Sequence, residues 1–221
     1  MKLNVLFIGN SHTYLHYMPR MLVALVKSAD RGYGLKVDQC TGEGVSLEWH
    51  WNNDPTREKI QSKAWDFVVL QDRSGGPLED LKSFQSHARL LDQEIKKQGG
   101  KTIFFMTWAN RSRPLTQAIL ANAYDHMAKE LGAILAPVGL AWETALNRVP
   151  GLNLHHEDGR HANSTGAYLS ACLFYALLFR SSPEGLPAAI FIQGKKRVDL
   201  DKSTALLLQK TAFETVMNTE I

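Results

Sequence analysis

The chain has 221 residues and a formal net charge of +3, with 44% hydrophobic and 21% charged residues. This length and composition suit a single globular domain over residues 1–221 with one large core. The basic residues are scattered apart from Lys195, Lys196 and Arg197, so we expect no nucleic-acid partner. No apolar run approaches the roughly 20 residues that cross a bilayer, so we expect no membrane partner.

The N-terminus and the two cysteines indicate the compartment. One lysine and then an apolar strand begin the chain, without the long apolar region and cleavage site of a signal peptide. The sequence as written predicts a cytoplasmic protein, and a secreted or periplasmic one if a leader has been removed. Cys40 and Cys172 lie in apolar segments and favour buried thiols over a disulfide. We expect no cofactor, and the oligomeric state stays open.

The first predicted element is a buried strand over residues 3–8. Apart from Asn4, these residues are β-branched or large and apolar; they are too few for a buried helix, and Gly9 and Asn10 end the run. Ser11 therefore follows the carboxyl end of a strand, where open α/β sheets bind their ligands. Ser11 is a candidate nucleophile, although a serine at this position often only caps the next helix.

Helices and strands alternate along the rest of the chain. Strands are predicted at 35–41, 66–71, 101–107 and 133–138, and an irregular region at 49–55. Helices are predicted at 14–29, about 84–98, about 115–131, around 140–147, from 161 or 163 to 179, and at 201–217. This alternation predicts a five-stranded parallel sheet with helices on both faces. The loops that leave the first four strands, which carry Ser11, Gly44, Gln71 and Asn110, can then converge at one edge.

A second group of reactive side chains precedes the long helix in the last third of the chain. Asp158 stands three residues before His161, and Gly159 eases the bend between them. The carboxylate can then hydrogen-bond one ring nitrogen while the other nitrogen faces outward. This geometry fixes the tautomer of a general base, so Ser11, His161 and Asp158 would form a catalytic triad.

Four short segments together resemble the blocks of the SGNH (GDSL-like) hydrolase superfamily. They are Gly9-Asn10-Ser11, Gly44, Gln71 and Asp158-Gly159-Arg160-His161, in the family's order; the first three follow predicted strands and the fourth precedes a predicted helix. The resemblance implies a flavodoxin-like three-layer α/β/α sandwich. It also implies that Ser11 is the nucleophile, His161 the base and Asp158 its orienting partner. The implied oxyanion hole consists of the Ser11 and Gly44 amides and the Gln71 side chain.

Two positions depart from the family pattern. Asn10 stands where the family usually has Asp, and it can hold the turn through local side-chain hydrogen bonds. Gln71 stands where the family usually has Asn, and its carboxamide is the same donor on a longer stem. Gly42 is an alternative to Gly44 as the second-block glycine, although the sequence after Gly44 looks more like that block.

The predicted function is ester hydrolysis through an acyl-enzyme, without a metal. His12, Arg73, Trp108 and Asn110 surround the expected site as candidate substrate-binding residues. Their polar and aromatic character suits a hydroxyl-rich substrate, such as an acylated sugar. We therefore expect a serine esterase for short-chain acyl esters that acts on a small-molecule or glycan ester, with deacetylation of a carbohydrate as one form. Hydrolysis and acyl transfer share the acyl-enzyme and are not separated.

Two other functions stay open. A catalytically degenerate member of the family would bind a glycan without hydrolysing it, which the substitutions at Asn10 and Gln71 allow. A metal-dependent hydrolase would instead use the cluster of His155, His156, Asp158 and His161, to which His12 could be added. Against the metal site, the cluster lies in a predicted loop without the four-residue helical spacing that directs two histidines at one ion.

Overall fold

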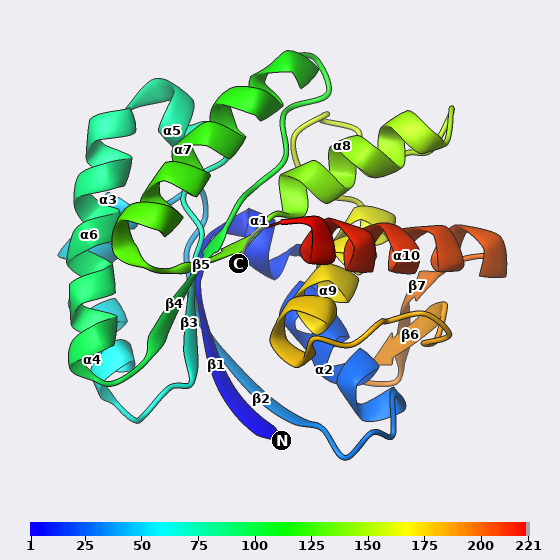
Figure 1. The fold of residues 1–221 in the computed structure, drawn as a ribbon, viewed down its shortest axis with the longest axis horizontal. Coiled ribbons are helices and arrows are strands. Elements are labelled where there is room, and N and C mark those ends of the chain that lie inside the picture. The colour runs from blue at the N-terminus through cyan, green and yellow to red at the C-terminus, as the bar shows by residue number, and fades with distance from the viewer. Residues whose placement is uncertain (220–221) are drawn as a thin grey trace.

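A five-stranded parallel sheet forms the centre of the computed structural model, which describes residues 1–219. The spatial order of the strands is β2-β1-β3-β4-β5 (Figure 1). They are β1 (Lys2–Gly9), β2 (Gly34–Thr41), β3 (Phe67–Leu70), β4 (Lys101–Phe105) and β5 (Ile134–Ala136). The predicted five-stranded parallel sheet is thus confirmed. Because β2 and β3 lie on opposite sides of β1, the strand order reverses there, which is where such sheets form a binding crevice.

One face of the sheet packs against one helix from the start of the chain and the three helices nearest the C-terminus. These helices are α2 (Met18–Ser28), α8 (Val138–Arg148), α9 (Ser164–Phe179) and α10 (Lys202–Asn218). In α9, every residue from 166 to 179 is buried, which explains why its sequence is apolar on all sides. Phe174 of α9 makes edge contacts with Phe7 of β1 and Phe105 of β4. This helix therefore forms the middle of the larger core.

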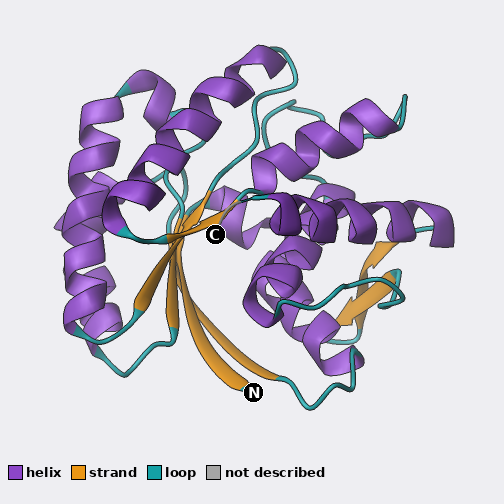
Figure 2. Cartoon of the chain, viewed as in Figure 1, coloured by secondary structure: helices purple, strands orange, loops and turns teal. Residues whose placement is uncertain are grey.

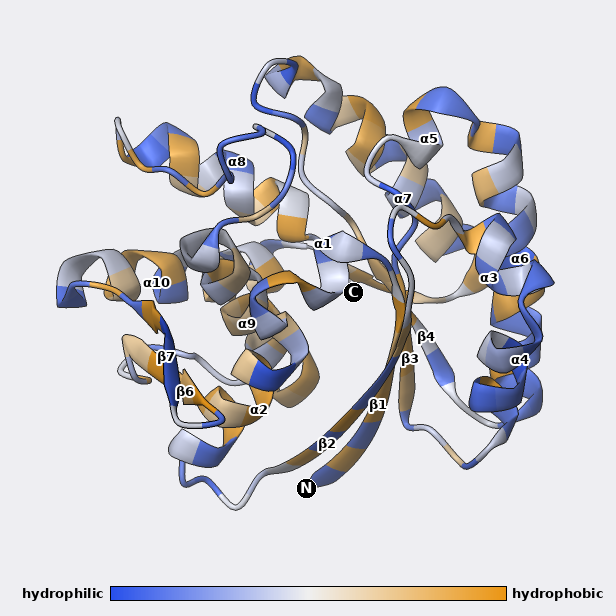
Figure 3. Cartoon of the chain, turned by 180° about the vertical axis from the view of Figure 1, so that it is seen from behind, coloured by the Kyte–Doolittle hydropathy of each residue, from blue (hydrophilic) through white to orange (hydrophobic). Residues whose placement is uncertain are grey.

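The other face is covered by helices from the middle of the chain. They are α3 (Leu47–Asn52), α4 (Asp54–Gln61), α5 (Gly76–Glu79), α6 (Leu81–Lys97) and α7 (Gln117–Leu131). α3, α4, α6 and α7 contribute to a second hydrophobic core against this face. Figure 2 shows helices on both sides of the strands, and Figure 3 shows that β3 is mainly hydrophobic whereas α4 is mainly hydrophilic. The result is an α/β sandwich of three layers.

Two segments differ from the sequence-based expectations. Residues 49–55, predicted to be irregular, belong to α3 and α4, and Ser46 caps α3 by accepting a hydrogen bond from the Trp49 amide. The predicted helix 14–29 is divided because His16 and Tyr17 have φ angles of 53° and 59°, which a right-handed helix excludes. It becomes α1 (Ser11–Tyr14), a 3₁₀ turn over Leu15–Tyr17, and α2.

An additional antiparallel hairpin was not predicted. Its strands are β6 (Ala189–Ile192) and β7 (Lys195–Asp199), and it carries the basic run 195–197. Both cysteines are free thiols; Cys172 is buried as predicted, whereas Cys40 is only half-buried. Within residues 1–219, none of the helices has the length and apolar character needed to span a membrane.

Candidate active site

The turn after β1 presents Ser11. β1 ends at Gly9, and the Asn10 side chain caps α1 by accepting a hydrogen bond of 3.0 Å from the His12 amide. Ser11 is the first residue of α1, so its own N–H has no acceptor within the helix. Only glycine fits before the cap, because a Cβ on Gly9 would lie 2.4 Å from Gln71 Oε1 and 2.6 Å from Thr13 Oγ1. The turn therefore holds a serine with a free backbone donor at the sheet edge.

The structure brings together the three residues of the predicted triad. Ser11 Oγ lies 2.9 Å from His161 Nε2, and His161 Nδ1 lies 2.6 Å from Asp158 Oδ2. The other oxygen, Asp158 Oδ1, accepts from the Arg160 and His161 amides at 2.8 and 2.9 Å. Gly159 adopts a φ of 68°, which the tight turn between the two residues uses. The residues thus form one continuous chain of hydrogen bonds from nucleophile to carboxylate.

The hydrogen bonds of Asp158 determine its charge. Desolvation by itself disfavours the carboxylate, but the bonds from the His161 ring and from the two backbone amides outweigh it and hold the pKa well below its usual range. Asp158 is therefore ionised at neutral pH. An ionised Asp158 accepts the Nδ1–H of His161, which leaves Nε2 to accept a proton from Ser11.

Two side chains from the loop after β4 anchor the loop that carries the base. Trp108 donates its indole N–H to the Arg160 carbonyl at 2.9 Å. The Arg111 amide donates to the Gly159 carbonyl at 2.8 Å, and its guanidinium donates to the carbonyls of His155 and His156 at 3.2 and 3.1 Å. Hydrogen bonds from Trp108 and Arg111 to backbone carbonyls thus hold the loop that carries His161, although this loop is distant from β4 in sequence.

Gln71 occupies a different place from the one that the family resemblance implies. Its Oε1 accepts from the Asn10 amide at 2.9 Å and from the Thr13 hydroxyl at 2.8 Å. Its Nε2 donates to Asn10 Oδ1 at 3.0 Å and also to the Asp72 carbonyl. The side chain is fully buried beneath the turn, and both of its amide hydrogens are engaged. The longer stem of glutamine therefore reaches under the turn and braces it, instead of facing the cavity.

Asn10 connects this brace to the loop after β2. Its Nδ2 donates to the Val45 carbonyl at 2.9 Å, next to Gly44. An aspartate at this position could not donate that bond. Gly44 has a φ of 63° and lines the same cavity as Ser11. The two departures from the family pattern, Asn10 and Gln71, are thus partners in one hydrogen-bond network.

His50 supports the same turn from below, a role that the sequence did not indicate. Its Nε2 lies 2.9 Å from the Gly9 carbonyl, and its Nδ1 lies 3.0 Å from Thr56 Oγ1. Because a carbonyl only accepts, Nε2 carries the hydrogen and the Thr56 hydroxyl donates to Nδ1. Burial lowers the pKa of His50 to about 4, so the ring is neutral. His50 was missed because it belongs to α3, a helix that the sequence did not predict.

A polar cavity of about 440 Å³ opens above Ser11. Ser11, His161 and Gly44 line it together with Arg73, Asn110 and Arg160. Arg73 forms an ion pair of 3.2 Å with Glu79. Asn110 is half-buried, and none of the hydrogen bonds between described residues uses its side chain. The expected substrate-binding residues Arg73 and Asn110 therefore do reach the cavity.

His12 and Trp108, also expected to bind substrate, are instead almost completely buried. Trp108 is stacked on Trp142 with ring centroids 3.9 Å apart, and His12 lies between Trp108 and His161 at 5.0 and 5.1 Å. Burial, together with the neighbouring His161, lowers the pKa of His12 to about 3. A neutral His12 ring does not repel the imidazolium that a catalytic His161 becomes. His12 nevertheless lines the polar cavity and Trp108 lines a second cavity beside it, so both rings support the base and present only a small exposed face to a substrate.

The histidine cluster near Asp158 does not converge on one point. His155 is buried and directs Nε2 to the Ala109 carbonyl at 3.1 Å, whereas His161 directs both ring nitrogens to the other triad members. Across the described part of the chain, residues 1–219, no group of three or more His, Cys, Asp or Glu side chains is arranged to hold a metal ion. The donor geometry thus gives the metal-dependent alternative no support.

Comparisons with known proteins rest on structure alone. No family model matches the sequence, and no curated protein matches it significantly. A DUF4886 family protein from Bacteroides uniformis is similar in structure, with a TM-score of 0.83 at 18% identity over 99% of this chain and 96% of that one. A protein from Slackia heliotrinireducens, named as a candidate SGNH hydrolase, gives 0.68 at 24% identity over 80% of this chain and 100% of that one.

An acetyl xylan esterase from Geobacillus stearothermophilus gives a TM-score of 0.63 at 16% identity, over 78% of this chain and 92% of that one. At these identities the similarity concerns the fold. The strand order and the covering helices agree with it. The chain therefore has the α/β fold of the SGNH hydrolases.

Proposed function

We propose that this protein is a serine esterase that hydrolyses short-chain acyl esters. The observation that carries the proposal is the hydrogen-bond chain from Ser11 Oγ through the His161 ring to Asp158, with distances of 2.9 and 2.6 Å. A serine that only caps a helix needs no such partners. The same three groups, in the same relation, perform acyl transfer on several unrelated folds.

The reaction follows from this geometry. Ser11 Oγ attacks the carbonyl carbon while its proton passes to His161 Nε2, and Asp158 stabilises the imidazolium through Nδ1–H. The bond between carbonyl carbon and alcohol oxygen then breaks, and His161 gives its proton to the leaving alcohol. Water attacks the acyl-serine, loses a proton to His161, and releases the acid as Ser11 regains its hydrogen.

The negative oxygen of the intermediate needs hydrogen-bond donors. Ser11, at the start of α1, and Gly44 line the same cavity, so their backbone amides are candidate donors, and pre-positioned donors of this kind stabilise an oxyanion strongly. Because the amide hydrogens of Gln71 are engaged elsewhere, Asn110 is the better candidate for the side-chain donor. It lines the cavity with Ser11, and its side chain has no hydrogen bond to the described residues.

The polar walls suit a short acyl group and a hydroxyl-bearing alcohol half. Arg73, Asn110 and Arg160 offer hydrogen-bond donors around the nucleophile. The substrate is then a small-molecule or glycan ester, and removal of acetyl groups from a carbohydrate is one form of this activity. The similarity in fold to a protein named as an acetyl xylan esterase is compatible with this form.

Release of p-nitrophenol from acetyl and longer acyl esters tests the proposal directly. We expect turnover by the wild-type protein, a preference for the acetyl ester, and loss of turnover in Ser11→Ala by at least roughly 10³-fold. A fluorophosphonate should label the wild-type protein at Ser11 and leave Ser11→Ala unlabelled. Equal activity of the two proteins would show that Ser11 is not the nucleophile. Two inert proteins that bind an acylated sugar would favour a binding function.

A further inference from the structure

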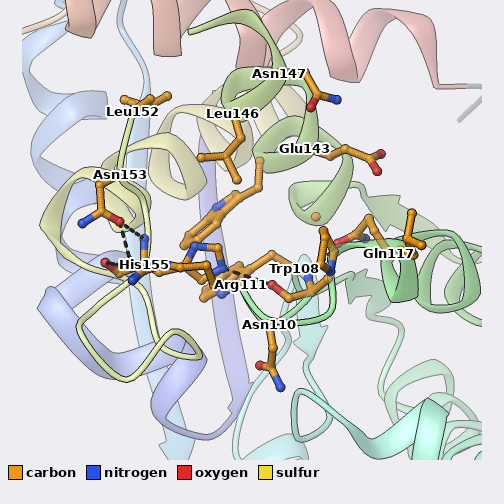
Figure 4. A pocket seen from close by; sticks show the side chains of 15 residues that line it. Trp108, Asn110, Arg111, Gln117, Glu143, Leu146, Asn147, Leu152, Asn153 and His155 are labelled. Atoms are coloured by element: carbon orange, nitrogen blue, oxygen red, sulfur yellow. Dashed lines mark hydrogen bonds between the residues drawn. The ribbon is translucent and has the colours of Figure 1, made fainter. Parts of the chain in front are cut away.

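A second cavity, also of about 440 Å³, lies beside the polar one. It is formed by the loop after β4, by α8 and by the segment that precedes the catalytic loop (Figure 4). Its apolar walls include Leu115, Leu146 and Leu152, with the Trp108–Trp142 pair behind them. This cavity is therefore chemically unlike the cavity above Ser11.

The two cavities are neighbours through Asn110, which lines both. In Figure 4 the Asn110 side chain points away from Leu146 and Glu143. Trp108 and Arg111 also line the apolar cavity, and these are the residues that bind the carbonyls of the loop carrying His161. The apolar cavity thus lies on the His161 side of the nucleophile.

The side on which the cavity lies indicates which half of an ester it receives. In the proposed reaction His161 Nε2 protonates the oxygen of the leaving alcohol, so the alcohol half must extend toward the loop of His161. Gly44 and Arg73 come from the loops after β2 and β3 and line the polar cavity but not the apolar one. The acyl half would lie toward those loops, which provide no comparable set of leucines.

The exposure of the leucines at the mouth of the apolar cavity indicates that its ligand is apolar. Leu115 is 90% exposed, and Leu146 and Leu152 are only half-buried. A bound alkyl or aryl group would remove this apolar surface from water, which is favourable in proportion to the area covered. Glu143 and Asn147 stand at the outer edge, so a group that fills the cavity would still meet polar side chains at its far end.

We propose that this cavity binds an apolar group, alkyl or aryl, on the alcohol half of the ester. This inference rests on the proposed esterase function and narrows its substrate. In the expected substrate, the acyl half is short. The part of the alcohol half next to the ester bond is polar or small and lies in the polar cavity, and the part that extends past Asn110 is apolar. An unsubstituted sugar acetate would leave the apolar cavity empty.

Acetates of unbranched alcohols test this assignment, because ethanol and hexanol are leaving groups of similar basicity. We expect kcat/KM to rise by roughly tenfold or more from ethyl acetate to hexyl acetate, since methylenes in a fitted apolar pocket are worth this much. Leu146→Trp, which fills the cavity, should bring the ratio of the two kcat/KM values close to one. Lengthening the acyl half instead, from ethyl acetate to ethyl hexanoate, should give no gain.

Substitutions at two exposed residues give a matched test and control, and neither should disturb folding. Leu115→Ser, at the rim, should lower the hexyl-to-ethyl ratio. Ile119→Ser should not change it, because Ile119 is 55% exposed on the same segment but does not line the cavity. If Leu146→Trp does not fold by circular dichroism, Leu115→Ser decides.

A ratio that is near one in the wild-type protein, or equal in wild type and Leu115→Ser, would overturn the assignment, as would a gain confined to the acyl half. Labelling of Ser11 by a fluorophosphonate reports the esterase site separately. Labelling and turnover without alcohol preference would overturn this inference alone. Absence of both would overturn the proposed function and this inference with it.

Discussion

Asp72 and Asp158 lie in two loops of the candidate site, and the pKa values of their carboxyl groups are shifted in opposite directions. Asp72 follows β3, is 3% exposed, and accepts a hydrogen bond from the Leu47 amide at 2.9 Å. Burial raises its pKa to about 6, although that bond and the Arg73 amide oppose the rise. The Asp158 side chain is 41% exposed, and its hydrogen bonds lower its pKa. The ionised carboxylate is thus disfavoured at Asp72, near the nucleophile, and stabilised at Asp158, next to the base.

The comparison shows two ways of fixing a catalytic group. Around Ser11, the side chains of Asn10, Gln71 and His50 form a buried network in which each group is held by several others. Around His161, an exposed loop is held mainly through its backbone carbonyls by Trp108 and Arg111. Buried networks are sensitive to the loss of any member. We therefore expect nucleophile-side changes to affect stability and base-side changes to affect catalysis.

The largest effect is expected for Asp158→Asn. An amide can donate to His161 Nδ1 and so favours the wrong ring tautomer, which should reduce kcat by roughly 10³–10⁴ while Tm changes little. Steady-state kinetics on p-nitrophenyl acetate and a thermal melt measure both. Glu157→Gln, an exposed neighbour in the same loop, is the matched control. Loss of activity in the control as well would show that the loop, not the triad, is the sensitive feature.

Asn110→Ala should reduce kcat by roughly 10²–10³, because removal of one oxyanion donor has effects of this size. The KM should change much less, since the bond is made to the transition state. Kinetics on a short acetate ester separate the two parameters. A change in KM alone would place Asn110 among substrate-binding residues and leave only backbone donors in the hole.

Gln71→Ala provides the contrasting variant on the nucleophile side. It removes the partners of the Asn10 amide and the Thr13 hydroxyl, so we expect a loss of about 1–3 kcal/mol of stability for each buried group left unpaired. The fall in Tm should therefore dominate over the fall in kcat measured well below Tm. A large loss of kcat with an unchanged Tm would restore Gln71 as an oxyanion donor.

Asp72→Asn should change how stability depends on pH. A folded-state pKa of about 6, raised from 3.8, favours the fold most below about pH 4, and this contribution is lost as pH rises through 6. The shift of about two units corresponds to about 3 kcal/mol. Between pH 4 and pH 7.5 the difference in unfolding free energy should therefore move in favour of Asp72→Asn. Parallel pH profiles of the two proteins, measured by urea denaturation, would contradict this burial effect.

The smallest effect is expected for Arg111→Lys. An ammonium cannot reproduce the guanidinium contacts to two carbonyls and Asn153, so His161 should be less well positioned and kcat should fall about tenfold, equivalent to about 1.4 kcal/mol. Arg113→Lys is the control, because Arg113 is exposed on the same loop and its side chain makes no hydrogen bond to the described catalytic loop, residues 155–161. Equal rates for both variants would show that Trp108 suffices to hold the loop.

The sequence by itself determined the sheet and the positions of most helices. The runs over residues 3–8, 66–71 and 101–107 have continuous apolar centres because their strands are covered on both faces, and that pattern is local. α3 and α4 were not recognisable, because Leu47–Gln61 contains only two strongly buried apolar side chains, Leu47 and Ile60, and no clear period. In the hairpin β6–β7, β6 is an apolar run of only four residues and β7 is a basic, mostly exposed stretch, so neither strand was recognised.

In the candidate active site, too, local sequence patterns were predictable and contacts between distant residues were not. Ser11, His161 and Asp158 were predictable because a strand-end serine and an Asp-x-x-His before a helix are local patterns, and the structure brings them within hydrogen-bond distance. The place of the Gln71 amide was not predictable, since it depends on which acceptors the folded chain offers: Asn10 Oδ1 and the Asp72 carbonyl lie under the turn. Only the tertiary structure decides that, because hydrogen bonds between residues distant in sequence exist only after the strands have met.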